Sequence, residues 1–181
     1  MRDVTASNFG ILIAYLIPGL ITVWGLGAVV PGLESLLVSE PQSEPTVGGF
    51  LYLTVASVGA GLFVSTVRWM LLDTLHHWTG LKRRALDFSR FHEIGGGYDP
   101  LNELHYRYYQ AHGNALIALA FSYVAHRFSG SAQLSASVSL DVAICLVLLV
   151  LFLGSRDTLR KYYERLNQLM GSTVHQDSSE E

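Results

Sequence analysis

The sequence predicts an all-α membrane protein with four transmembrane helices, and three observations support this fold class. Half of the 181 residues are hydrophobic and only 15% are charged, whereas soluble domains carry about 25% charged residues. No charged residue lies between Asp3 and Glu34 or between Glu44 and Arg68. The basic residues gather in alternate connections between the apolar segments. An apolar helix of about twenty residues spans a bilayer core of roughly 30 Å, so the gaps in charge mark membrane spans.

The four predicted spans cover residues 9–30, 50–72, 111–128 and 136–154. The first span is too long for a signal peptide and no small-x-small cleavage site follows it, so we expect a retained anchor. Pro18 and Gly19 interrupt this helix, because proline lacks a backbone donor and collides with the preceding turn. The third span is short, and a buried or re-entrant helix is an alternative for it.

The second span carries a stripe of small residues. Ser57, Gly61 and Ser65 recur every four residues, and small residues at this spacing let two helix backbones approach closely in lipid. The stripe therefore predicts a helix-packing face, either within the four-helix bundle or between copies in a homo-oligomer. The helix is expected to continue to Thr79 and to end at Gly80, because glycine adopts the left-handed conformation of a helix C-terminus.

A connection over residues 73–110 follows the second span. Its basic residues Lys82, Arg83 and Arg84 are expected to lie against anionic lipid headgroups. Asp99 is the predicted N-cap, and Pro100 the first residue, of a helix that continues into the third span.

The C-terminal region is predicted to leave the membrane after the fourth span. Residues 155–170 show an amphipathic pattern typical of a helix at a surface. Gly171 is expected to end this helix, and residues 171–181 to form a disordered acidic tail. The predicted organisation is a single integral-membrane domain over residues 1–170 with this tail.

The orientation follows from the basic residues. The connection over residues 31–49 has three glutamates and no basic residue, the connection over residues 68–107 has six basic residues, and four more follow the fourth span. The positive-inside rule then predicts that both termini and the central connection are cytoplasmic, in a bacterial inner membrane. The net charge of −3 provides no basic face, so no nucleic-acid partner is predicted.

Four side chains are the candidate metal ligands. Asp73 and His77 share one face of the second helix, and His105 and His112 form a stripe on the third. If the two helices face each other, this set could bind zinc or iron. Two alternatives stay open: the histidines are amphipathic interface residues, or they act in a protonation-dependent switch. The single cysteine, Cys145, excludes an intramolecular disulfide and a cysteine metal site.

Arg107 and His112 are the candidate catalytic pair. They form the R-x4-H spacing that HEPN ribonucleases use, although about one such spacing is expected by chance among this many arginines and histidines. The chain contains no nucleophile elbow, P-loop or dinucleotide fingerprint. An enzymatic role therefore has little support from motifs.

Two further charged positions lie at the edges of the spans. Arg68, at the end of the second span, is interpreted as a snorkelling anchor whose guanidinium reaches the lipid headgroups. Asp141 opens the fourth span, where it is expected to cap the helix or to lie at the interface, and where it could pair with Arg127 at the end of the third. A place in an ion or proton path is the alternative.

These features favour a non-enzymatic multi-pass membrane protein, an oligomeric pore or an effector or sensor regulated from its cytoplasmic face. One alternative is a membrane-embedded metal-dependent enzyme that acts on lipid at the inner interface. Another is a small accessory subunit of a larger membrane complex. The expected partners are the lipid bilayer and either further copies of the chain or another membrane or cytoplasmic protein.

Overall fold

All regular secondary structure in the described part of the chain is helical. A computed structural model describes residues 10, 12–30, 32–33, 46–81, 105–129 and 137–177. By length and composition, three helical stretches in these residues could cross a membrane, namely Leu12–Val29, Val47–Trp78 and Val138–Gln168. The predicted class, an all-helical protein with membrane-spanning helices, is confirmed at this level, with three candidate spans in place of the predicted four.

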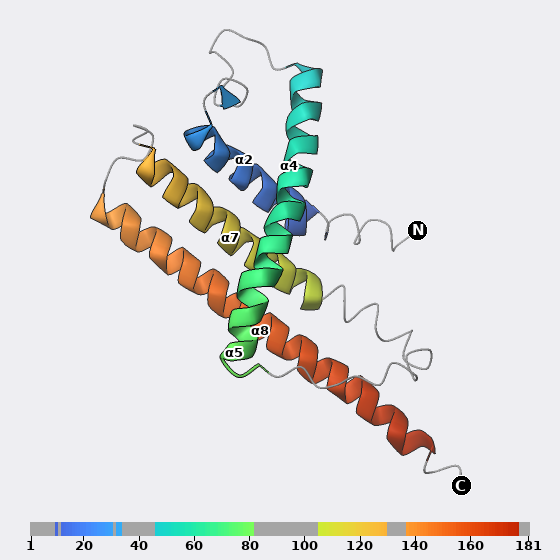
Figure 1. Cartoon of the computed structure of the whole chain (residues 1–181). Coiled ribbons are helices and arrows are strands. Elements are labelled where there is room, and N and C mark those ends of the chain that lie inside the picture. Colours follow the sequence, from blue (N-terminus) through green and yellow to red (C-terminus); the bar gives the residue numbers. More distant parts are fainter. Residues whose placement is uncertain are drawn as a thin grey trace.

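The helices of the described residues form four rods. The elements are η1 (Leu12–Leu16), α2 (Ile17–Val29), α4 (Val47–Arg68), η2 (Trp69–Asp73), α5 (Thr74–Trp78), α7 (Arg107–Phe128) and α8 (Val138–Asp177). η1 continues into α2, and α4 continues through η2 into α5. The α2, α7 and α8 rods lie alongside one another, while α4 crosses them steeply (Figure 1). α2 and α7 run in one direction and α4 and α8 in the other. We call the end of the bundle where α5 ends and α7 begins the α5 end.

The first rod changes its helical bonding at Pro18. The segment before it is a π-helix, and α2 begins with this proline in its first turn. Since Pro18 has no N–H, the carbonyl of Ala14 one turn earlier loses its regular α-helical donor. The side-chain Nδ2 of Asn114 donates to that oxygen from α7 at 2.7 Å. The interruption predicted from Pro18 and Gly19 is therefore compensated by a buried polar residue of another helix, which agrees with the rule that lipid leaves no backbone group without a partner.

Glycines allow η1 and α2 to touch both neighbouring helices. A Cβ atom at Gly19 would overlap the carbonyl of Ser57, and one at Gly61 would overlap the carbonyl of Tyr15. On the other side of α2, a Cβ atom at Gly25 would overlap Ser122. Ser57 and Gly61 of the predicted small-residue stripe are thus used inside the bundle.

The third residue of that stripe, Ser65, is only half-buried. The buried positions of α4 continue instead along Val64 and Arg68.

The α7 rod packs against the other three rods and is less apolar than α2 and α4. Its buried side chains include three polar ones, Asn114, Ser122 and His126. Asn114 and Ser122 donate to backbone carbonyls of the first rod, and the ring of His126 lies 3.9 Å from that of Trp24. Together with His112 and Arg127 nearer its ends, these polar residues leave α7 too polar to be among the candidate spans, although its 22 residues measure about 33 Å.

The α4 to α5 rod ends where the sequence predicts. Gly80 has φ = 99°, the N–H of Leu81 donates to the carbonyl of His76 at 3.1 Å, and the N–H of Gly80 donates to that of His77 at 3.2 Å. This pair of bonds is a Schellman motif, which only glycine enters without strain. The predicted end of the helix at Gly80 is confirmed.

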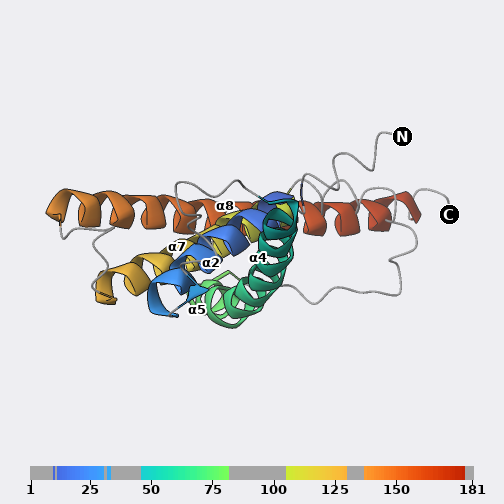
Figure 2. The ribbon, with the colours of Figure 1, turned by 90° about the horizontal axis from the view of Figure 1, so that it is seen from above.

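The last rod differs from its prediction. α8 runs without a break from the apolar segment into the amphipathic one, over 40 residues or about 60 Å, and extends past the other helices (Figure 2). The prediction that Gly171 ends the helix is wrong, because α8 continues to Asp177. Glycine lowers helix propensity by about 1 kcal/mol but stops a helix only where φ becomes positive, and among the described glycines only Gly32 and Gly80 have positive φ.

Several predicted features lie outside the described residues. These are Lys82, Arg83 and Arg84, the cap at Asp99 and Pro100, and residues 178–181 of the tail.

Candidate functional site

Five polar side chains meet near the α5 end, where the α4 to α5 rod, α7 and α8 converge. Arg68, Asp73 and His76 come from the first of these rods, Tyr109 from α7 and Ser155 from α8. We call these five residues the polar cluster. Arg68, His76, Tyr109 and Ser155 are buried, and the Asp73 side chain is largely buried. Ionisable groups inside an apolar bundle are costly and commonly functional, so the cluster is the candidate site.

Arg68 is the centre of the cluster. It is only 2% exposed, and its Nη1 donates to Oδ1 of Asp73 at 3.0 Å. The guanidinium carbon lies 4.7 Å from the centre of the Tyr109 ring, a cation–π distance. Gly113 makes room for the side chain, because a Cβ atom there would lie 2.6 Å from Cδ of Arg68. The interpretation of Arg68 as a snorkelling anchor is wrong, because α7 offers it both space and a ring.

Tyr109 ties α7 to the ion pair. Its hydroxyl donates to Oδ1 of Asp73, the same oxygen that Arg68 contacts. A tyrosine phenol ordinarily loses its proton only near pH 10. The phenol therefore stays protonated and acts as a hydrogen-bond donor at neutral pH.

His76 joins the cluster to α8. Its Nε2 lies 3.0 Å from Oγ of Ser155, and its ring lies 5.1 Å from that of Phe152. Within the described residues, Nδ1 of His76 and Nε of Arg68 are buried without a hydrogen-bond partner. A buried polar atom without a partner costs about 1–3 kcal/mol. Each of these two nitrogens could gain a hydrogen bond if the surrounding helices moved.

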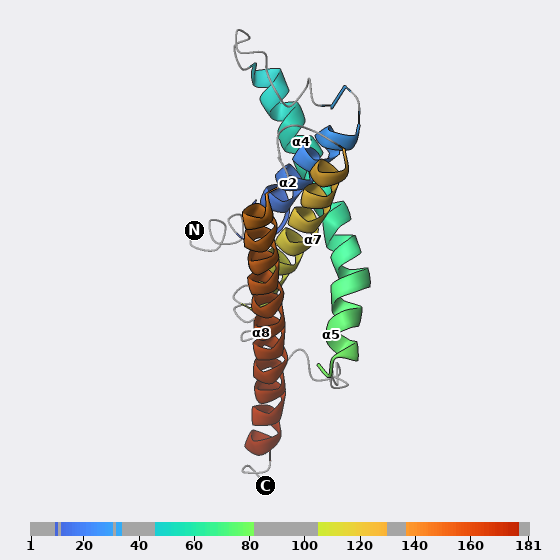
Figure 3. The same ribbon diagram turned by 90° about the vertical axis from the view of Figure 1, so that its left-hand side faces the viewer.

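Outside the polar cluster, α5 and α8 are joined by side chains at their surfaces. Arg156 donates through Nη1 to Oγ1 of Thr79 at 2.6 Å and through Nη2 to its carbonyl at 3.0 Å. His77 contacts the ring of Tyr163. In Figure 3 the α5 and α8 rods lie apart, on the two flanks of the α5 end. Side-chain contacts are therefore what connect them.

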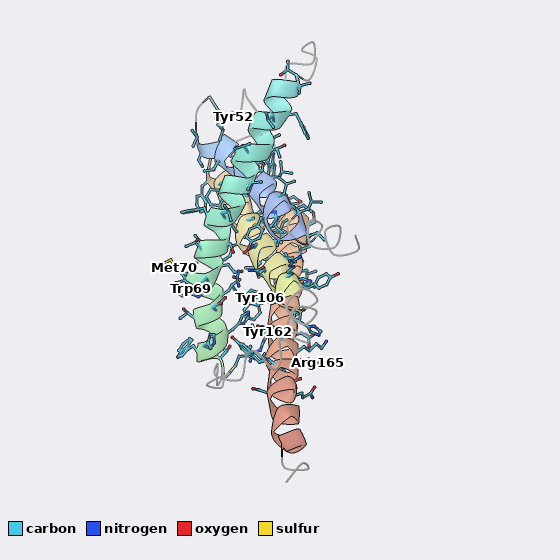
Figure 4. The ribbon with its side chains drawn as sticks, turned by 90° about the vertical axis from the view of Figure 1, so that its right-hand side faces the viewer. Tyr52, Trp69, Met70, Tyr106, Tyr162 and Arg165 are labelled. Carbon is cyan, nitrogen blue, oxygen red and sulfur yellow. The ribbon has the colours of Figure 1, made fainter. Side chains whose placement is uncertain are left out.

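An aromatic layer fills the space between the flanks. Tyr109, Leu159, Tyr162 and Leu166 form a buried apolar group, and Tyr106 packs against it. Figure 4 shows Tyr106 and Tyr162 between the two rods. Trp69 and Met70 lie on the opposite, exposed side of the α4 to α5 rod (Figure 4). An exposed tryptophan near the end of a span is typical of a membrane interface.

The structure does not bring the four predicted metal ligands together. Asp73 belongs to the polar cluster, whereas Nδ1 of His77 contacts the main-chain carbonyl of Asp73. Nδ1 of His112 contacts the carbonyl of Tyr108, and His105 is half-buried. In the described part of the chain no three His, Cys, Asp or Glu side chains are grouped as a metal site requires. The α4 to α5 rod and α7 do meet at the α5 end, but the side chains in contact there are Asp73 and Tyr109.

Arg107 and His112 of the predicted catalytic pair lie against different elements. A Cβ atom at Gly10 would overlap the Arg107 side chain, and one at Gly154 of α8 would lie 3.1 Å from the His112 ring. Residues five apart on a helix point about 140° away from each other, which accounts for their separation.

A second polar group joins α7 and α8 at the opposite end of the bundle. Nη2 of Arg127 lies 3.5 Å from Oδ2 of Asp141, and the hydroxyl of Tyr123 donates to Oδ1 of Asp141. The pairing of Arg127 with Asp141 is confirmed. Both charged side chains are more than a third exposed, so this contact is a clamp at the surface of the bundle.

The sequence contains a pattern that predicts the burial of Arg68 and His76, and it is a continuation of the stripe of small residues. Ser57, Gly61, Val64, Arg68, Leu72 and His76 follow one another at intervals of three and four residues. This spacing defines one face of a helix, so Arg68 and His76 extend the same packing face as Gly61. His76, rather than His77, is the histidine that this face buries.

A comparison of the chain with protein families, with curated sequences and with solved structures found no significant match.

Proposed function

We propose that this protein is a non-enzymatic, multi-pass membrane effector or sensor whose state is controlled at the α5 end. The observation that carries the proposal is the buried polar cluster with its two unpartnered nitrogen atoms, Nε of Arg68 and Nδ1 of His76. A buried ion pair is weak evidence for stability, because an apolar pair of similar volume is often as stable. A polar group that can exchange partners suits a change between two packings of the helices.

The contacts between α5 and α8 support a moving joint. His76 with Ser155, and Arg156 with Thr79, link the two rods through hydrogen bonds between side chains or from a side chain to a carbonyl. A hydrogen bond between neutral groups contributes about 0.5–1.5 kcal/mol and one from a charged group about 1.5–3 kcal/mol, so a signal of a few kcal/mol is sufficient to break either contact. We call these two contacts the α5–α8 latch.

The polar residues of α7 support an action on the membrane itself. Asn114, Ser122 and His126 continue the line of buried polar side chains from the polar cluster toward the opposite end of the bundle. Separation of the rods at the latch would expose the polar cluster, at which this line begins, to water. A change in membrane permeability is the output that such an exposure favours.

Opening of the latch is expected to change both the distance between the rods and the permeability. The double variant Ser155→Ala, Arg156→Ala removes both latch contacts from α8. Spin labels are attached at Trp78→Cys and Arg160→Cys in a Cys145→Ala background. Pulsed electron paramagnetic resonance in proteoliposomes then measures the distance from α5 to α8. We expect a longer and broader distance distribution, and dye release from the same vesicles that is about tenfold faster, which corresponds to about 1.4 kcal/mol.

Lys161→Ala is the matched control, because Lys161 is an exposed residue of α8 whose partner, Asp157, lies on the same helix. It should change neither the distance nor the release. If the double variant kept the wild-type distance distribution and released no dye, the proposed function would be wrong.

We also propose that α7 crosses the membrane, which gives four spans with both termini on the cytoplasmic side of a bacterial inner membrane. The alternating directions of α2, α4, α7 and α8 support four crossings, as do the inward-facing polar groups of α7. The basic residues between the second and third spans and after the fourth support the orientation.

Reporter fusions test this topology, because three spans would leave the termini on opposite sides. Green fluorescent protein fluoresces in the cytoplasm after fusion to either terminus, and alkaline phosphatase is active only outside it. We expect both terminal fluorescent fusions to be bright, and a phosphatase fusion at Glu40 to be active. One bright and one dark terminal fusion would show that α7 does not cross.

A further inference from the structure

An apolar groove runs along α4 on the part of the bundle away from the α5–α8 latch. α2 and α7 supply its other wall, and its volume is about 790 Å³. It extends on α4 from Gly48 to Val67, a helical length of about 28 Å. The groove exists because α4 crosses α2 steeply at Gly19 and Gly61, so that the two helices diverge from this contact.

The lining of the groove is suited to hydrocarbon. Its walls are aliphatic and aromatic, and none of the described residues that line it is charged. The hydroxyl of Thr22 already donates to the carbonyl of Pro18 at 2.8 Å, so it requires no further acceptor. Small residues of α4 form the floor, including Ala56 and Ala60, and a Cβ atom at Gly48 would meet no atom within 4 Å.

The groove also opens toward the surroundings of the bundle. Tyr52 and Phe63 line it and are 64% and 68% exposed. Tyr52 lies near the end of α4 that is far from Tyr162 (Figure 4). Because α4 is long and apolar enough to span a membrane, bilayer lipid is the molecule that meets this opening.

We propose that the groove is a binding site for one acyl chain of a membrane phospholipid. Its volume lies in the range of about 300–1,000 Å³ that is typical of sites for small molecules. Recognition is through the chain and not the headgroup, since no charged side chain is available in the lining to bind a phosphate. A lipid held in this way fills the angle between α2 and α4 and fixes their crossing.

Photocrosslinking in nanodiscs tests the proposal. The full chain is placed in discs of dioleoyl phosphatidylcholine that contain a small fraction of the same lipid with a diazirine near the chain terminus. We expect crosslinks to concentrate on groove residues of α2 and α4, and native mass spectrometry to find one retained lipid per protein. Ala56→Phe, which fills the floor, should lower the lipid-bound fraction about tenfold, as the loss of a chain's apolar burial predicts.

Val58→Phe is the matched control, because Val58 lies on the same helix, is exposed and does not line the groove. It should leave lipid retention unchanged. Ala60→Leu is a second, smaller filling variant for use if Ala56→Phe does not yield a monodisperse protein. Discs of anionic dioleoyl phosphatidylglycerol should give the same retention. Crosslinks spread evenly around α4, equal losses in filling and control variants, or retention of anionic lipid alone would overturn the proposal.

Discussion

Gly61→Ala is expected to destabilise the fold strongly, by about 3 kcal/mol or more. The added Cβ atom would overlap the backbone carbonyl of Tyr15, and neither backbone can move without parting η1 from α4. Overpacking of a core by one methyl group commonly costs about 1–3 kcal/mol, and a clash with backbone lies at the upper end of this range or above it. Thermal unfolding of the purified protein in detergent, followed by circular dichroism, measures the loss.

Gly59→Ala is the matched control for this prediction. Gly59 lies two residues earlier on α4, is exposed, and has no atom within 4 Å of a Cβ at its position. Alanine should therefore leave the melting temperature unchanged or raise it, since alanine favours a helix by about 1 kcal/mol over glycine. Equal melting temperatures for Gly61→Ala and the wild type would show that η1 and α4 do not approach each other as closely as described.

Asp73→Ala is expected to lower the free energy of unfolding by about 3–5 kcal/mol, because it leaves the Arg68 guanidinium buried without a counter-ion. The hydroxyl of Tyr109 loses its acceptor as well. Thermal unfolding in detergent, followed by circular dichroism, measures this loss of stability. A low yield of the variant from membranes should accompany it. Asp157→Ala is the comparison, because this carboxylate pairs with Lys161 on the surface of α8, where an ion pair contributes about 0.5 kcal/mol or less.

A double variant separates the stability of the polar cluster from its function. In Arg68→Met, Asp73→Leu both charges are absent, so no unpaired charge is buried and most of the stability should return. If the cluster controls the α5–α8 latch, this stable variant should still differ from the wild type in dye release or in the distance from α5 to α8. If Asp73→Ala lowered the free energy of unfolding as little as Asp157→Ala does, the burial of Arg68 would be contradicted.

Local patterns were sufficient for much of the fold. The gaps in charge located the helices that can span a membrane, and Gly80 correctly marked the end of the second rod. The pairing of Arg127 with Asp141 followed from their positions at the ends of adjacent helices. Each of these features depends on residues close in sequence or on helices joined by a short connection.

The predictions that failed depended on the environment of a side chain. Gly171 is followed by further helix because glycine is tolerated where φ stays negative. Arg68 points inward because Gly113, 45 positions later, leaves a space and Tyr109 presents a ring to its guanidinium. His76 rather than His77 continues the face of Gly61 and Arg68, and the tertiary structure shows that it meets Ser155 of α8 there.

The sequence by itself thus determined that the chain is helical, that it has helices suited to a membrane, and that the second rod ends at Gly80. Hydropathy and helix-ending residues act locally, so they can be read along the chain. Only the tertiary structure decided which partners the buried polar groups meet. Asn114 meets the carbonyl that Pro18 leaves free, and Arg68 meets Asp73 and Tyr109, because glycines let the helices approach at those points. The partner of a buried polar group is set by the crossing of distant helices, and no local pattern contains that information.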